Sequence, residues 1–134
     1  MNILIDTNAY ASFKYGEETT VAILQKAELI GLSVIVIGEL LSGFRLGKYE
    51  KQNCKELNDF IASTRVRILF IDENTTYYYS MIYHQLKEKG KPIPTNDLWI
   101  AATAFQNGLP IFTYDRHFSE IDGLLVINSP ELLI

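Results

Sequence analysis

Cysteine is almost missing from this 134-residue sequence, and the single one present limits its chemistry. Cys54 has no partner for an intramolecular disulfide, and a metal site built from several cysteines is excluded. We expect Cys54 to be a small buried or half-buried residue on a helix. The functional chemistry must therefore come from other side chains.

Long apolar runs are also missing. The longest, residues 32–41, is broken by Ser33, Gly38 and Glu39, so it is too short and too polar to span a bilayer. The N-terminus enters a hydrophobic strand pattern directly, without the basic segment and cleavage site of a secretory leader. We therefore expect a cytoplasmic protein with no membrane partner. The length fits one domain over residues 1–134.

A strong basic charge is the third thing the sequence lacks. Its 16 acidic and 12 basic residues give a formal charge of −4, whereas nucleic-acid-binding proteins usually carry basic surfaces. That argument fails if several acids are gathered in one metal site. Setting four acids aside leaves 12 acidic against 12 basic residues, so the rest of the surface is neutral and has room for a basic patch.

The pattern of short and long segments predicts an α/β fold. Five β-branched or apolar runs are too short for helices and are predicted as strands: residues 2–6, 33–36, 67–71, 110–113 and 125–127. Helical spacing predicts helices over residues 17–29, 39–46, 49–63, 75–89 and 95–106. Gly31 is the expected C-terminal cap of the first, and Asp72 or Asn74 the N-cap of the fourth. This alternation is typical of a central parallel sheet of about five strands flanked by helices.

Four acids fall where such a sheet brings side chains together. Asp6 ends the first strand, and Glu39 follows the second at the start of a helix. Asp97 opens the helix that leads into the fourth strand, and Asp115 follows that strand. Ligands of open parallel sheets bind outside the carboxyl ends of the strands, near the point where strand order reverses. We therefore expect all four carboxylates at one edge of the sheet.

Each acid taken alone also has a purely structural interpretation. Asp6 can begin a turn, and Asp115 can cap a short segment. Asp97 can be a first-turn residue that the helix dipole favours, with Thr95 as the N-cap. Glu39 is harder to explain in this way. It lies in the apolar segment 34–41, where a lone buried carboxylate is costly without a partner or a cation.

Four carboxylates gathered at one edge favour a bound metal ion. Like charges at close range repel and raise one another's pKa, and a hard divalent cation relieves this cost. Oxygen ligands without cysteines favour Mg²⁺, or Mn²⁺, over Zn²⁺. Such ions are suited to hydrolysis of phosphodiesters, because they activate water and orient the phosphate. A metal-dependent nuclease is the function that this chemistry predicts.

The segments around the acids resemble the four motifs of PIN-domain ribonucleases. They are LIDTN at residues 4–8, IGELLSG at 37–43, TNDLWIAA at 95–102 and TYDRHF at 113–118. In order, spacing and length the sequence is most similar to the VapC toxins of bacterial toxin–antitoxin pairs. The resemblance covers essentially the whole chain. It implies a PIN-like three-layer fold, an RNA substrate such as tRNA or ribosomal RNA, a small antitoxin partner and a homodimer.

The resemblance also implies roles for individual residues. Asp6 and Asp97 match the principal Mg²⁺ ligands of the family, and Glu39 and Asp115 match its supporting acids. The small polar residues that hold the acids or the phosphate are matched by Asn8, Asn96 and Thr113, which are equally well explained as turn and cap residues. The sequence departs from the family at two places: Arg116, His117 and Ser119 stand where some members have a further acid, and Val36 stands where a hydroxyl residue is common.

Basic side chains are candidates for RNA contacts. Arg45, Lys48, Lys51 and Lys55 recur at intervals of three, three and four, and share one face if the helices on either side of Gly47 run nearly continuously. That face is either an ordinary solvated surface or a site for RNA phosphates. Arg116, beside Asp115, is a further candidate.

Two other functions are alternatives to the nuclease. A receiver-like signalling domain also gathers carboxylates and Mg²⁺ at a sheet edge, but it needs a phosphate-accepting aspartate, for which Asp72 is the candidate, and a late lysine, and none follows Lys91. A non-catalytic PIN domain that only binds RNA or protein is disfavoured by the complete set of four acids.

Overall fold

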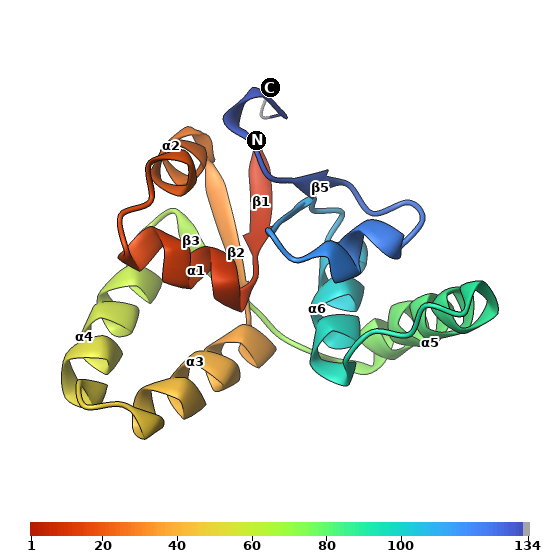
Figure 1. The fold of residues 1–134 in the computed structure, drawn as a ribbon, viewed down its shortest axis with the longest axis horizontal. Coiled ribbons are helices and arrows are strands. Elements are labelled where there is room, and N and C mark those ends of the chain that lie inside the picture. The colour runs from red at the N-terminus through yellow and green to blue at the C-terminus, as the bar shows by residue number, and fades with distance from the viewer. Residues whose placement is uncertain (133–134) are drawn as a thin grey trace.

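Five parallel strands form the centre of the molecule, as the computed structural model of residues 1–132 shows (Figure 1). They are β1 (Asn2–Ile5), β2 (Leu29–Ser33), β3 (Val66–Leu69), β4 (Ile111–Phe112) and β5 (Val126–Ile127). Their order across the sheet is β3-β2-β1-β4-β5, and every neighbouring pair is parallel. The predicted α/β class with about five parallel strands is confirmed.

Helices cover both faces of this sheet. They are α1 (Thr7–Lys14), α2 (Glu18–Lys26), α3 (Val34–Leu46), α4 (Glu50–Ile61), α5 (Glu73–Lys89) and α6 (Thr95–Gln106), with the short 3₁₀ helices η1 (Arg116–Glu120) and η2 (Pro130–Leu132). From β1 the chain adds β2 and β3 on one side of the sheet, and it then crosses back to add β4 and β5 on the other side of β1. Because such crossovers are right-handed, α5 and α6 cover the face of the sheet opposite to the one covered by the helices before β3. Figure 1 shows α1, α2 and α4 on one side and α5 and α6 on the other. Within residues 1–132, no helix is both long and apolar enough to cross a membrane.

The central strand β1 lies in the middle of the hydrophobic core. Ile3, Leu4 and Ile5 are all fully buried, because β2 and β4 flank the strand and helices cover both its faces. Helix α6 is buried along residues 100–104. The burial of β1 and α6 fixes the two segments that carry Asp6 and Asp97.

The second strand lies earlier in the chain than predicted. The β-branched residues 34–37 belong to α3, because the hydroxyl of Ser33 caps that helix by accepting a hydrogen bond from the Ile35 amide at 3.0 Å. The pairing of β2 with β1 and β3 selects residues 29–33 as the strand instead. The first predicted helix accordingly ends at Lys26, and Gly31 is a strand residue rather than a cap. A Cβ at Gly31 would lie 2.7 Å from Leu69 Cδ1, so a larger residue at this position would require the Leu69 side chain to shift.

Two further differences concern the elements around the acids. Helix α1 was not predicted, and it follows β1 directly with Asp6 as its N-cap. Because α3 begins at Val34, Glu39 lies in its second turn and not at a helix start. Two helix predictions are confirmed: α6 spans residues 95–106, and Asp72 caps α5. Cys54 is half-buried on α4, as expected.

Candidate active site

The four predicted acids converge on one cleft at the carboxyl edge of the sheet. Strand order reverses at β1, which has β2 on one side and β4 on the other, and this is where ligands of open parallel sheets bind. The cleft has a volume of about 480 Å³. Its lining includes Asp6, Glu39, Asp97 and Asp115, together with the predicted polar residues Asn8 and Asn96.

Asp6 is the most deeply buried of the four, with 4% of its surface exposed. Its Oδ1 accepts a hydrogen bond from the Ala9 amide at 2.8 Å and caps α1, while its Oδ2 accepts one from the Thr113 hydroxyl. Burial raises the pKa of Asp6 to about 6; the two donors oppose this, and the nearby Asp115 and Asp97 carboxylates add to it. Asp6 is therefore both a helix cap and a member of the cleft.

Thr113 links two of the acids. Its hydroxyl donates to Asp6 and also accepts a hydrogen bond from the Asp115 amide at 2.9 Å. The residue is 1% exposed, just after β4, where its side chain has no access to solvent. Thr113 thus fixes the segment after β4 against the end of β1, which is consistent with its predicted supporting place.

Glu39 is held from two helices. The Thr7 hydroxyl on α1 donates to its Oε1 at 2.5 Å, and the Asn96 side chain on α6 donates to its Oε2 at 3.3 Å. Asn96 was among the predicted supporting residues, whereas Thr7 was not. The available signal for Thr7 was a hydroxyl directly after Asp6 in the segment LIDTN.

Asp97 and Asp115 meet at a third side chain, His117. Its Nδ1 lies 2.9 Å from Asp97 Oδ2 and 3.2 Å from Asp115 Oδ1. Asp115 also caps η1 by accepting a hydrogen bond from the His117 amide at 2.9 Å. Ligand atoms of the three residues lie within 4.8 Å of one another, close enough to hold one metal ion. His117 adjoins a predicted acid, but a lone histidine carried too little signal to be selected.

The pKa of Asp97 is raised above its ordinary value. Burial is the main cause, the hydrogen bond with His117 opposes it, and the carboxylates of Asp115 and Glu39 add to it. The predicted capping role of Thr95 is wrong, because the N-cap is Pro94 and provides no side-chain hydrogen bond. Since Thr95 is already the first helical residue, its hydroxyl is not at the cap position.

The aspartate that a receiver-like domain would need does not line the cleft. Asp72 accepts hydrogen bonds from the amides of Asn74 and Thr75 and from the Gln106 side chain. These bonds lower its pKa, with that from Gln106 the strongest cause. Asp72 is a helix cap.

The predicted basic face is interrupted. Gly47 is extended, so α3 and α4 are separate helices that meet at an angle (Figure 1), and the condition of near-continuity is not met. Lys48, Lys51 and Lys55 still line one shallow depression with Tyr49. Arg45 pairs with Glu50 at 3.7 Å and Lys55 with Asp59 at 3.0 Å. Arg116 is exposed beside Asp115.

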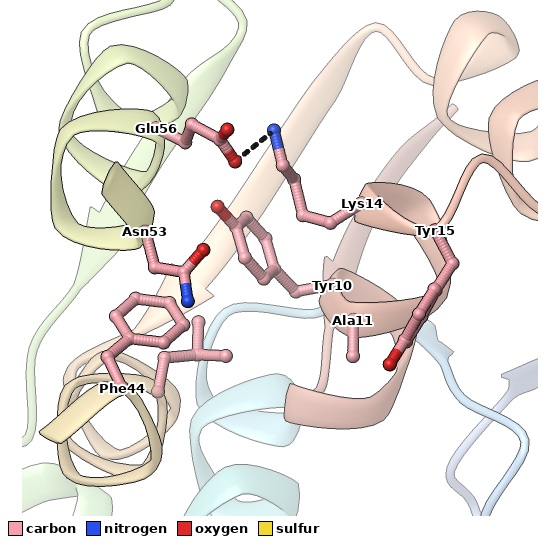
Figure 2. A pocket seen from close by; sticks show the side chains of 8 residues that line it. Tyr10, Ala11, Lys14, Tyr15, Phe44, Asn53 and Glu56 are labelled. Carbon is pink, nitrogen blue, oxygen red and sulfur yellow. Dashed lines mark ion pairs between the residues drawn. The ribbon is translucent and has the colours of Figure 1, made fainter. Parts of the chain in front are cut away.

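A second concave surface, the helix groove, lies between α1, α3 and α4 (Figure 2). Tyr10, Leu40 and Phe44 form its apolar part, and Lys14 pairs with Glu56 across it at 3.0 Å. Tyr10 is 2% exposed, and within residues 1–132 its hydroxyl has no hydrogen-bond partner. Burial raises the pKa of Tyr10 to about 12, and Glu56 adds to this. The groove and the cleft share helices α1 and α3.

Comparisons with known proteins agree on one family. Residues 3–124 match the sequence model of the PIN domain. Ribonuclease VapC2 of Rickettsia felis is 31% identical over 133 residues, which cover 96% of this chain and 98% of that protein. The crystal structure of VapBC2 from Rickettsia felis, bound to a promoter DNA fragment, superposes with a TM-score of 0.84 at 28% identity, covering 96% of this chain and 99% of that one. FitAcB from Neisseria gonorrhoeae gives a TM-score of 0.76 at 30% identity, with 99% and 100% covered.

Proposed function

Because the chain belongs to the PIN-domain family and is a ribonuclease of the VapC type, we propose that it is a divalent-metal-dependent endoribonuclease. The convergence of Asp6, Glu39, Asp97 and Asp115 on one cleft carries this proposal. Mg²⁺ is the expected ion, with Mn²⁺ as a substitute, because carboxylate oxygens dominate the donor set.

The residues of the cleft fit a bound cation. The raised pKa values of Asp6 and Asp97 mean that ionisation of these carboxyl groups is unfavourable in the cleft. A bound divalent ion offsets that unfavourable free energy. We assign these two residues as the principal ligands, with Glu39 and Asp115 in support. The bound cation supplies an activated water and neutralises charge on the phosphate. Thr7, Asn96 and Thr113 hold the acids in place.

The proposed substrate is RNA of the translation apparatus, either a tRNA or a loop of ribosomal RNA. The cleft is open to solvent on the side of Asn8 and Asn96, both of which are exposed. We propose that Lys48, Lys51 and Arg116 provide salt-sensitive contacts to phosphates, while Arg45 and Lys55 contribute less because acids already pair with them.

We also propose a small antitoxin as partner, docked in the helix groove. Several solved relatives are VapBC complexes, in which the toxin is paired with its antitoxin. The groove offers an apolar floor that includes Leu40 and Phe44, with Lys14 and Glu56 at its side, which suits a peptide segment with an apolar anchor. Phe44→Glu should abolish capture of the proposed antitoxin, whereas Leu46→Glu, at a 92% exposed position on the same helix, should not. Equal capture by both variants would exclude this groove.

A homodimer in the cytoplasm completes the proposal. Tyr77 and Met81 are large and exposed, at 75% and 47%, and lie one turn apart on the same face of α5. A second copy of the chain would cover such a surface. Light scattering of Met81→Lys beside the unmodified protein measures whether this helix holds the dimer together.

The test of the nuclease function uses matched carboxylate variants. Purified protein is incubated with total RNA or tRNA and Mg²⁺ or Mn²⁺, beside Asp6→Asn, Asp97→Asn and the control Asp122→Asn, which removes one exposed charge away from the cleft. We expect both cleft variants to lose at least about 100-fold in cleavage rate, since even residues that only orient a metal ligand contribute roughly 10–100-fold. The control should cleave like wild type. Equal cleavage by all four proteins would refute the metal site, and mapping of 5′ ends after brief induction identifies the RNA.

A further inference from the structure

His117 brings a nitrogen donor to a cleft otherwise lined by oxygen donors. It lies on η1 between Asp115, which caps this short helix, and Phe118, which is 1% exposed in the core. Helix η1 also packs against α6, which carries Asp97. The core therefore positions the backbone of His117 beside both carboxylates, so that its place is set by packing rather than by a free loop.

The distances around Nδ1 fit a shared ion. Nδ1 lies 2.9 Å from Asp97 Oδ2 and 3.2 Å from Asp115 Oδ1. Two neighbouring ligands of an octahedral ion bound at 2.0–2.1 Å are separated by about 3 Å. Nδ1 can carry only one proton, which cannot be directed well at two carboxylate oxygens at once. A cation bound between Nδ1 and the two carboxylate oxygens can accept a lone pair from each of the three atoms.

We propose that His117 Nδ1 is a ligand of the catalytic cation, together with Asp97 and Asp115, and that this nitrogen shifts the preference of the site toward Mn²⁺ over Mg²⁺. The inference rests on the metal-dependent function proposed above. Mg²⁺ is a hard ion that gains little from an imidazole ligand, whereas first-row transition ions bind nitrogen more readily. Asp6 and Glu39 complete the oxygen side of the site.

The test is pulsed EPR of the full chain loaded with Mn²⁺, which detects ¹⁴N coupled to the ion and needs no activity. The chain has two histidines, so His84 is a matched control. It lies on α5, pairs with Glu88 at 3.1 Å and has a 74% exposed side chain. We compare wild type, His84→Gln and His117→Gln, and titrate each with Mn²⁺ and Mg²⁺ by calorimetry.

We expect a histidine ¹⁴N coupling in wild type and His84→Gln and its loss in His117→Gln. Mn²⁺ affinity should fall at least about 10-fold in His117→Gln, the lower end of the cost of disturbing a metal site, while Mg²⁺ affinity changes less. Bound Mn²⁺ without nitrogen coupling in wild type would overturn the role of His117 and leave the carboxylate site standing. Failure of wild type to bind either ion would overturn both proposals, and that result is distinct from the first.

Discussion

The two halves of the acidic cleft are held in different ways. In the buried half, the carboxylate of Asp6 receives hydrogen bonds from a backbone amide and from the buried hydroxyl of Thr113. In the open half, Asp97 and Asp115 face each other across His117, whose side chain is 46% exposed. The fold alone fixes the first arrangement. The second depends on contacts among side chains that are partly exposed to solvent.

The pH dependence of stability gives the largest expected effect and belongs to the buried half. With chelator present, the folded protein keeps the Asp6 proton up to about pH 6, whereas the unfolded chain releases it near 3.8. The folded state therefore binds more protons in this window, and the free energy of unfolding falls as pH rises, by roughly 3 kcal/mol in total. Urea denaturation from pH 4 to pH 7 measures it. The fall should be smaller by about this amount in Asp6→Asn, where Asp97, whose pKa is also raised, still contributes; an identical profile in that variant would contradict the prediction.

Thr113→Val breaks the link between the halves. The change keeps the shape of the side chain but removes the donor to Asp6 and the acceptor for the Asp115 amide. We expect the free energy of unfolding to fall by about 1–3 kcal/mol, and divalent-cation affinity to fall roughly 10–100-fold. Calorimetry and urea denaturation measure both, and Thr113→Ser should restore most of each. Wild-type cation binding by the valine variant would show that the hydroxyl has no positioning role.

Asp97→Asn tests the open half. In chelator this variant should melt at the same temperature as wild type or higher, because its ionised carboxylate is disfavoured by burial and by the neighbouring acids. Differential scanning calorimetry provides the measurement. A drop of more than about 4 °C, the size expected for roughly 1 kcal/mol in a small domain, would show that Asp97 is chiefly structural.

Tyr114→Phe should have the smallest effect. The Tyr114 hydroxyl lies 3.0 Å from Thr20 Oγ1 and 3.3 Å from Glu17 Oε2, and so ties the segment after β4 to the start of α2. This contact is partly exposed, so its loss should cost at most about 1 kcal/mol of the unfolding free energy. Cation affinity should not change, because Thr113 still holds the acids. If Tyr114→Phe instead lowered cation affinity as much as Thr113→Val, the contact between Tyr114 and the start of α2 would also be needed to hold the acids in place.

The sequence predicted the location of the acids better than the elements that carry them. Helix α6 was predictable because its near-continuous apolar run is too long for a strand and is bounded by Pro94 and by Asn107-Gly108. The β-branched run 34–37 misled the strand assignment, since propensity gave way to the cap at Ser33 and to pairing within the sheet. Glu39 still reaches the cleft, one helical turn later than expected. The resemblance to PIN-domain ribonucleases of the VapC type is confirmed.

The contacts made by Thr7 and His117 were beyond prediction from sequence. Thr7 reaches Glu39 across 32 positions and His117 reaches Asp97 across 20, so both depend on how helices pack against one another. No local pattern encodes such packing. The metal ion, the RNA and the role of each acid stay predictions that the experiments above address.

Helix α1 belongs to two surfaces at once: Thr7 at its start bonds to Glu39 in the cleft, and Tyr10 one turn later lies in the helix groove. Because α1 contributes to both the cleft and the groove, fewer substitutions should be tolerated in α1 than in helices that line only one of them. If the groove is the antitoxin site proposed above, a substitution near the start of α1 that changes the groove would also shift Thr7 and its bond to Glu39. On that proposal, we expect relatives to change partners through α4, where Asn53 and Glu56 line the groove without lining the cleft. Helix α1 should then vary least among them.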